Sequence, residues 1–170
     1  RSIADEDCYL FLLNNDTVVA PECVDVLRRT FESHPEAGAV SPVITFADRP
    51  DVVWYGGGRV SLRRKSVFVH RFIDAPLAAL PRGKAWESDF CTGCAFLTTK
   101  RIFQAAGGFD ERYFLYFEDV DLSWTIRGSG LRLLVTPETV VVHKGSVSSS
   151  SVGSSFSFYH QTRSRQIFYL

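Results

Sequence analysis

Short apolar runs alternate with segments of helical spacing along the 170-residue chain. The first run, Tyr9–Leu13, is continuous, which is typical of a short strand buried on both faces. It ends in the polar Asn14-Asn15-Asp16 and then resumes for three residues. Pro21 suits the first turn of a helix, where its missing N–H is not needed, and apolar residues follow at helical spacing up to Phe31. This opening predicts a strand, a polar turn and a helix.

The middle of the chain predicts several more strands. One apolar run is interrupted by Pro42, and two others adjoin a glycine-rich corner at Gly56–Gly58. Residues 74–89 contain two prolines and are long for an unstructured connection, which is a property of functional or mobile loops. The expected strands are residues 38–46, 51–62, 66–73 and 90–99.

The last third returns to alternating elements. Residues 100–108 predict a short helix closed by glycine, and residues 131–143 predict two short strands. Serine dominates residues 146–157, which favours a flexible loop, and residues 158–170 read as the start of a helix. Strands that alternate with helices predict an α/β fold with a mixed sheet.

Residues 118–128, EDVDLSWTIRG, carry conflicting signals. Apolar and polar residues alternate strictly from Val120 to Ile126, and a period of two predicts a strand. As a helix, the same residues form two opposite apolar pairs, which suits a helix covered on both sides, and Gly128 and Gly130 would end it. The pattern alone favours the strand.

Composition narrows the class of protein. The chain is 45% hydrophobic with a formal net charge of +0, so it fits one globular domain and lacks the basic excess of a nucleic-acid-binding protein. No apolar run reaches the roughly 20 residues of a membrane-spanning helix. The sequence contains no Met, and we expect it to be a fragment of a longer protein.

The four cysteines include one C-x-x-C, formed by Cys91 and Cys94. A zinc site would need a second pair or histidines at ligand spacing, which Cys8 and Cys23 do not obviously supply. A redox motif should lead into a helix, whereas this one leads into an apparent strand. Small buried cysteines in a reducing compartment explain them better, and a zinc-structured domain is a minor alternative.

Four acidic residues could carry chemistry. Asp16 follows a buried strand, where open α/β sheets bind ligands, and a single hard oxygen ligand suits Mg²⁺ or Mn²⁺. A plain strand-to-helix turn explains the same residues. Glu118, Asp119 and Asp121 follow an aromatic run, and at a helix start they could include a general base or merely favour the helix.

Two further features have both a functional and a structural interpretation. His143 closes an apolar strand and could be a metal ligand, a base or a satisfied histidine at a strand end. Trp54 precedes the triple glycine, and aromatic faces there could bind a sugar ring or simply pack in the core. The glycines lack phosphate-loop spacing.

The order of these segments closely resembles that of the inverting family 2 glycosyltransferases of the GT-A fold, particularly the bacterial rhamnosyltransferase-like members. FLLNNDTVV and the long segment CTGCAFLTTKRIFQAAGGFDERYFLYFEDVDLSWTIRGSGLRLLVTPETVVVHKGS carry the resemblance, and GGFDERYFLYFEDVDLSWTIRGSG is its most specific part. It implies a hexosyl- or rhamnosyl-type transferase of cell-surface polysaccharide biosynthesis. It also implies that residues 118–128 are a helix, against the alternation.

The resemblance implies a role for each candidate residue. The metal-binding D-x-D motif falls on Asn14-Asn15-Asp16, so Asp16 is the one charged ligand, and His143 matches a histidine that joins the metal in some members. The general base falls on Asp119, with Glu118 and Asp121 as neighbours that tune it. The residues expected to bind donor or acceptor are Asn14, Asn15, Trp54, Gly57, Gly93 and Asp121.

The resemblance also divides the chain and implies its partners. Members carry a first, nucleotide-binding half before the Asp16 strand, so we expect residues 1–170 to be the second half of one catalytic domain, inactive alone. Its parts would be the metal-site segment 8–46, the variable donor and acceptor region 51–99, the base segment 100–145, the loop 146–157 and the helix start 158–170.

A nucleotide-diphospho-sugar donor and a saccharide or lipid-linked acceptor are the expected substrates, and no nucleic acid is expected. We expect a cytoplasmic location at or near the inner membrane face, peripheral membrane association, and self-association through an exposed sheet edge. A non-catalytic carbohydrate-binding or interaction module on the same scaffold is the alternative, because one D-x-D carboxylate is missing.

Overall fold

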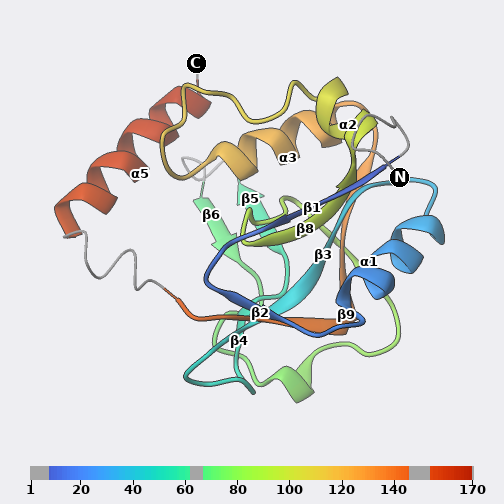
Figure 1. Ribbon diagram of the computed structural model, residues 1–170. Coiled ribbons are helices and arrows are strands. Elements are labelled where there is room, and N and C mark those ends of the chain that lie inside the picture. Colours follow the sequence, from blue (N-terminus) through green and yellow to red (C-terminus); the bar gives the residue numbers. More distant parts are fainter. Residues whose placement is uncertain (1–7, 62–66, 146–153, 170) are drawn as a thin grey trace.

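The structure, a computed structural model, describes residues 8–61, 67–145 and 154–169 (Figure 1). Its main sheet has seven strands and the central order β1-β8-β3-β9-β2, with β4 added beside β3 and β7 beside β9. Strands β3 and β9 run parallel, and the other pairs of this sheet are antiparallel. The fold is therefore α/β with a mixed sheet, as predicted.

The strands of the main sheet are β1 (Tyr9–Leu13), β2 (Thr17–Val19), β3 (Ala37–Phe46), β4 (Val53–Tyr55), β7 (Trp86–Ser88), β8 (Ala95–Thr99) and β9 (Arg132–His143). A separate hairpin pairs β5 (Gly58–Ser61) with β6 (Val67–His70). The helices are α1 (Cys23–Glu32), α2 (Lys100–Ala105), α3 (Glu118–Gly128) and α5 (Ser154–Phe168), with a 3₁₀ turn η2 (Leu77–Ala79).

Helices α1 and α3 cover opposite faces of the sheet. Leu27 of α1 packs in one buried cluster with Val40 and Leu97. Leu122 and Ile126 of α3 pack in a second cluster, with Ala39, Phe96 and Leu133. Because Ala39 and Val40 are sequence neighbours on a strand, as are Phe96 and Leu97, they point to opposite faces. Helix α5 extends from the α3 side of the molecule (Figure 1).

The helix predicted at residues 118–128 is confirmed as α3. Its alternating residues fail as a strand signal because this helix has apolar partners on two sides, one of them fully buried. Leu122 and Ile126 lie in the core, whereas Trp124 is 40% exposed and its ring lies 6.0 Å from that of Phe168 on α5. Two opposite apolar faces, one in the core and one in contact with α5, therefore produced a period of two in a helix.

Strands β3 and β9 correct two predictions. Residues 37–46 form one strand that passes through Pro42 without a break, and residues 132–143 form one strand rather than two. The pairing register shifts between Pro42 and Val43, which face Thr136 and Val140. The extra residues of β9 form a bulge at the point where proline cannot donate a ladder hydrogen bond.

Other boundaries also differ from the predictions. The strand expected at residues 90–99 contains only Ala95–Thr99, and the connection at 74–89 contains η2 and β7. Residues 154–157 of the expected serine-rich loop belong to α5, which therefore begins before residue 158; residues 146–153 lie outside the described part. Within the described residues, no helix is long and apolar enough to span a membrane.

Candidate active site

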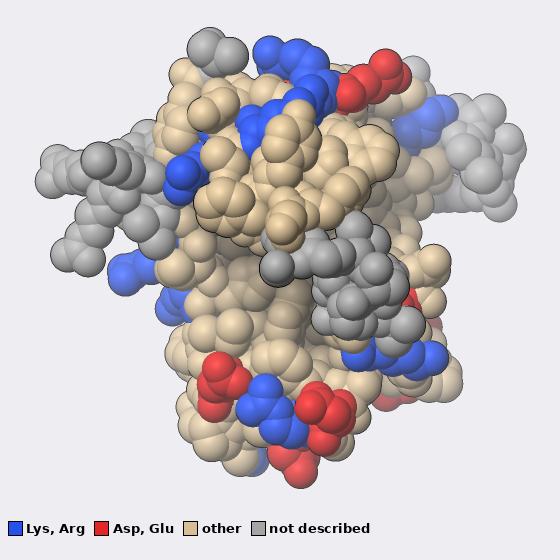
Figure 2. Space-filling model, turned by 90° about the vertical axis from the view of Figure 1, so that its left-hand side faces the viewer, with Lys and Arg blue, Asp and Glu red and all other residues tan. Residues whose placement is uncertain are grey.

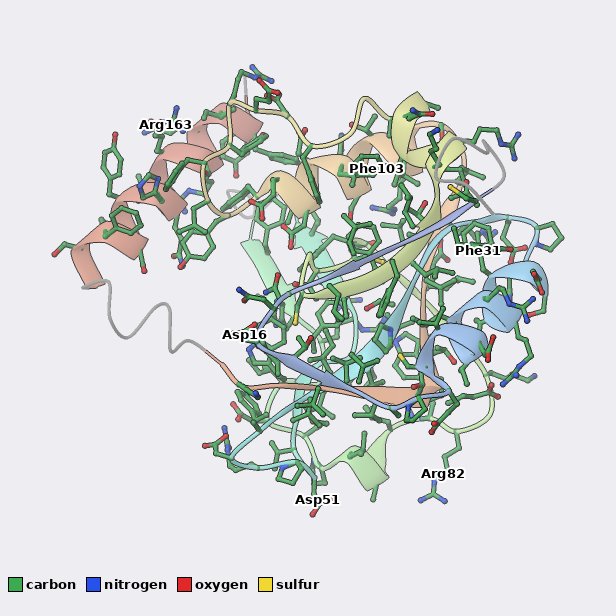
Figure 3. The ribbon with its side chains drawn as sticks, viewed as in Figure 1. Asp16, Phe31, Asp51, Arg82, Phe103 and Arg163 are labelled. Carbon is green, nitrogen blue, oxygen red and sulfur yellow. The ribbon has the colours of Figure 1, made fainter. Side chains whose placement is uncertain are left out.

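The turn that carries Asp16 joins the outer strands β1 and β2 and is tied at both ends. The backbone N–H of Asn14 donates to the Cys94 carbonyl at 2.9 Å, and Lys144 N–H donates to the Asp16 carbonyl at 2.8 Å. The Thr17 hydroxyl donates to the Asn14 carbonyl at 2.7 Å. Figure 3 shows Asp16 at the edge of the sheet where β1 turns into β2. This turn is therefore held by the residue that precedes β8 and the residue that follows β9.

Asp16 and His143 lie side by side. His143 ends β9 and pairs with Thr17 across the β2–β9 ladder. Its Nε2 lies 3.2 Å from Asp16 Oδ2, and the side chains are 12% and 23% exposed respectively. One carboxylate oxygen and one imidazole nitrogen this close can bind the same divalent ion.

This donor set fits a weakly held Mg²⁺ or Mn²⁺. Among the described residues, no group of three His, Cys, Asp or Glu side chains could hold a metal ion. Mg²⁺ sites commonly use one or two protein ligands and complete the shell with substrate phosphates and water. The pair therefore suits an ion that arrives with a phosphorylated ligand, rather than a closed structural site.

Asp119 lies in the first turn of α3, and both of its carboxylate oxygens accept backbone hydrogen bonds. Gly93 N–H donates to Oδ2 and Val120 N–H donates to Oδ1, each at 2.8 Å. The two residues before α3, Tyr116 and Phe117, have φ angles of 65° and 74°. Left-handed conformations cost energy for non-glycine residues and cluster at functional sites, where the surroundings hold them.

The neighbouring acids have different environments. Burial raises the pKa of Glu118 and the charge of Asp119 adds to that rise, while Glu118 Oε2 is buried with no hydrogen-bond partner among the described residues. Asp121 accepts a hydrogen bond from the Tyr113 hydroxyl at 3.3 Å. The Glu118 carboxylate is therefore close enough to Asp119 to feel its charge, whereas the Asp121 carboxylate is hydrogen-bonded to Tyr113.

Burial also raises the pKa of Asp119 above its ordinary value. The N–H groups of Gly93 and Val120 oppose this rise, because hydrogen bonds to a carboxylate favour its ionised form. A carboxylate that is held in place, with its pKa raised, has the properties of a general base.

One short loop connects the two acidic positions. Cys94 accepts from Asn14 of the Asp16 turn, and the preceding residue, Gly93, donates to Asp119. Burial, followed by the charges of Asp16 and Asp119, raises the pKa of the Cys94 thiol to about 12. The backbone of Gly93 and Cys94, within the C-x-x-C, therefore bridges the two acidic positions.

Trp54 and Gly57, predicted to bind donor or acceptor, have distinct positions. The Trp54 ring lies between two histidine rings, with its centroid 4.6 Å from that of His143 and 4.6 Å from that of His70. Gly57 has a φ of 112°, and an added Cβ would lie 3.4 Å from Trp86 Nε1. Trp54 therefore adjoins the Asp16–His143 pair, whereas the backbone conformation of Gly57 already explains a glycine there.

His70 is a site residue that the sequence reasoning missed. It ends β6, and its ring lies 4.6 Å from that of Trp54, which also contacts His143, and 6.0 Å from that of Phe90 in the segment that leads to Gly93. Its only signal in the sequence is a histidine in the aromatic segment VFVHRF, and such a histidine has no distinguishing spacing. The long-range pairing of the hairpin with the site could not be inferred locally.

The face that bears α5 has a hollow. Seen from this side, uncharged residues dominate the centre, Lys and Arg side chains lie near the top, and a charged group lies at the bottom (Figure 2). The surface is hollowed below the upper bulge. The Asp16 turn in Figure 3 lies at the same side of the molecule.

Known proteins resemble this chain in sequence. The family description "Glycosyltransferase like family 2" matches residues 4–168. N-acetylglucosaminyl-diphospho-decaprenol L-rhamnosyltransferase of Mycobacterium tuberculosis is 26% identical, over 81% of this chain and 47% of the relative. The rhamnosyltransferase WbbL of Escherichia coli K12 is 32% identical, over 82% of this chain and 53% of the relative. The chain spans about half the length of these two relatives.

The fold also matches a solved glycosyltransferase structure. GalNAc-T7, solved with UDP, GalNAc and Mn²⁺, superposes with a TM-score of 0.59 and 18% identity, over 79% of this chain and 27% of that one. At this identity the likeness shows the GT-A-like fold and nothing more. The family match covers nearly the whole chain, including both acidic positions and the histidine that ends β9. The chain therefore belongs to glycosyltransferase like family 2.

Proposed function

We propose that this chain supplies the metal ligands and the general base of an inverting, metal-assisted glycosyltransferase. The observation that carries the proposal is the Gly93–Cys94 step, which links the Asp16 turn to the Asp119 carboxylate. The transferred sugar would lie between these two ends. Family membership supports sugar transfer. The geometry supports metal binding at the Asp16 end and proton removal at the Asp119 end.

Asp16 and His143 would hold Mg²⁺ or Mn²⁺ beside the diphosphate of a nucleotide-sugar. When bound, the cation neutralises the negative charge that grows on the leaving diphosphate. The neighbouring Asn14 and Asn15 are exposed and uncharged, so they can donate amide hydrogen bonds to phosphate or sugar oxygens.

Asp119 would accept the proton of the acceptor hydroxyl as that oxygen attacks the anomeric carbon. The attack comes from the face opposite the diphosphate, so the configuration inverts. The backbone N–H groups of Gly93 and Val120 aim the carboxylate, and burial raises the pKa of Asp119 and makes it a stronger base. Glu118, whose own pKa is raised by burial and by the charge of Asp119, would tune the base as its neighbour.

The substrates and setting follow from the relatives by analogy. Two relatives are named rhamnosyltransferases, and one of them is named for a decaprenol-linked acceptor. We propose a nucleotide-diphospho-sugar donor and a lipid-linked saccharide acceptor in polysaccharide biosynthesis, used at the cytoplasmic face of a membrane. Donor selection would involve parts of the parent protein outside these 170 residues, so the isolated chain would transfer little or no sugar.

A donor screen with the full-length parent protein tests the proposal. Nucleotide release would be measured with each nucleotide-sugar, a lipid-linked saccharide and Mn²⁺, and product anomers would be assigned by NMR. Release that depends on metal and acceptor, with an inverted product, is the expected result. A retained configuration would refute the assignment of Asp119 as base, and robust transfer by the 170-residue chain would refute its dependence on the parent.

A non-catalytic carbohydrate-binding module is the second candidate. The single carboxylate of Asn14-Asn15-Asp16 favours it, because a D-x-D motif would supply two. A calorimetric titration of the parent with nucleotide, with and without Mn²⁺, separates the candidates. Metal-dependent nucleotide binding is expected for the enzyme, and sugar binding without it would favour the module.

A further inference from the structure

His70 is held firmly among aromatic rings beside the proposed sugar position. Its ring meets Trp54 edge-on at 4.6 Å and Tyr55 edge-on at 5.1 Å, and it lies 6.0 Å from Phe90 at a tilt. Tyr55 and Phe90 are buried, so two of these three walls belong to the core. The imidazole is therefore fixed by packing, while its residue as a whole is only partly buried.

One ring nitrogen of His70 already has a partner. Nδ1 lies 3.1 Å from the carbonyl oxygen of Trp54. Because a carbonyl oxygen only accepts, Nδ1 must carry the proton of this hydrogen bond. In the neutral ring Nε2 is then an acceptor, and no described residue donates to it in the structure. Burial lowers the pKa of His70, which favours that neutral ring.

The position of His70 relates it to both ends of the site. It shares the Trp54 ring with His143, whose own Nε2 faces Asp16. On its other side the His70 ring lies 6.0 Å from that of Phe90, three residues before Gly93, whose N–H donates to Asp119. A sugar that spans the gap between the metal pair and the base would therefore pass close to this imidazole.

We propose that His70 is a sugar-binding residue whose Nε2 accepts a hydrogen bond from a hydroxyl group of the substrate. The inference rests on the proposed function and adds a specificity contact to the same site. The bound hydroxyl belongs either to the transferred sugar or to the accepting sugar. His70 exchanges no proton in the reaction; it orients the ring between Asp16 and Asp119.

Three substitutions in the full-length parent separate the two ring nitrogens. His70→Gln can place its amide oxygen near Nε2 but gives up the Nδ1 bond. His70→Asn can keep a donor near Nδ1 for the Trp54 carbonyl, but its side chain is too short to place an acceptor at the position of Nε2. His70→Phe keeps the aromatic packing and removes both polar atoms. Thermal unfolding and the Kd of the nucleoside diphosphate with Mn²⁺ establish that each variant folds and retains the metal side.

Steady-state kinetics with donor and acceptor varied separately provides the test. We expect kcat/KM to fall about 10- to 100-fold in His70→Asn and His70→Phe, the loss typical of one hydrogen bond to substrate, and less than about 5-fold in His70→Gln. A loss confined to the donor KM assigns the hydroxyl to the transferred sugar, and a loss confined to the acceptor KM assigns it to the accepting sugar.

Several outcomes would overturn the proposal. If His70→Asn were as active as the wild type, the role of His70 would be limited to its hydrogen bond with the Trp54 carbonyl. Equal losses in all three variants would show that a hydrogen-bond acceptor at the position of Nε2 is not required. Unchanged kinetics in all three would remove His70 from the site. The wild-type parent serves as the separate control, because its failure to transfer any sugar would refute the proposed function itself.

Discussion

The two ends of the site are built in opposite ways. At the metal end, the backbone of the Asp16 turn is tied to Cys94 and Lys144, whereas the side-chain partner of the carboxylate among the described residues is His143, with Nε2 at 3.2 Å. At the base end, both oxygens of Asp119 accept backbone N–H groups before any ligand binds. The metal end therefore depends on what binds it, whereas the base end is organised in advance.

This difference matches the chemistry proposed for each end. A cation that arrives with the nucleotide must be able to leave with it, so a sparse ligand set is an advantage there. A general base must be held within hydrogen-bond reach of one hydroxyl, so a fixed carboxylate is an advantage. Substitutions at the two ends should consequently affect different steps.

Asp119→Asn in the parent should have the largest effect. We expect kcat to fall by about 10²- to 10⁴-fold, because a positioned base typically contributes that much, while the Kd of the nucleotide-sugar is unchanged. Rapid-quench kinetics and calorimetry measure the two quantities. Glu118→Gln is the matched control with a smaller loss. Full activity in Asp119→Asn would mean that the base lies elsewhere.

Asp16→Asn should affect the other end. Removing a group that holds charge against the leaving diphosphate should lower kcat/KM by about 10²- to 10³-fold. Unlike the change at Asp119, it should also weaken nucleotide binding in Mn²⁺, which titration calorimetry measures. Equal nucleotide affinity with and without this carboxylate would break the contrast between the two ends.

Phe168→Ala tests whether α5 supports the base end. The Phe168 ring lies 5.3 Å from that of Phe68 and 6.2 Å from that of Phe117, which precedes α3 in a left-handed conformation. We expect a loss of about 1–3 kcal/mol in the free energy of unfolding, measured with denaturant, because the side chain is only partly buried. We also expect kcat of Phe168→Ala to fall while the Kd of the nucleotide stays unchanged.

Phe158→Ala on the same helix is the control for that experiment. Its side chain is 72% exposed, so its removal should change the free energy of unfolding by less than about 0.5 kcal/mol. If the two variants were equally stable and equally active, α5 would have no part in holding Phe117.

The pH dependence should show the smallest effect. Burial raises the pKa of Asp119, so the base becomes protonated, and kcat falls, at a pH above the ordinary aspartate value of 3.8. Because the folded chain binds this proton more tightly than the unfolded chain, the contribution of Asp119 to stability decreases as pH rises through that window. An acid limb at or below the ordinary value in the kcat profile would contradict a buried base.

Local patterns sufficed for part of this structure. The strand that precedes the Asp16 turn follows from a short apolar run, and the helix after Pro21 follows from helical spacing; both are present. For residues 118–128 the pattern favoured the wrong element, because Leu122 and Trp124 face different neighbours across a helix. Only the resemblance to a family corrected that prediction.

The rest depended on contacts between distant segments. The Gly93 N–H that donates to Asp119 comes from a loop 26 residues earlier, and the sequence around this glycine gives no signal of that hydrogen bond. The position of Trp54 between His143 and His70 depends on the packing of β4 beside the hairpin. His70 itself was missed, because a single histidine at a strand end has no informative spacing.

The Gly93–Cys94 loop has a consequence for redesigning the proposed sugar site. One residue of the loop is bonded to each acidic segment, so a change in loop length would displace Asp119 relative to Asp16 and disturb both at once. Redesign for a larger or smaller sugar should therefore leave residues 91–94 intact and vary the β5–β6 hairpin. That hairpin forms a separate two-stranded sheet. It is bonded to the main body through Gly58, Val60 and His70, so a redesign should keep their hydrogen bonds to Ser88, Asp89 and Trp54.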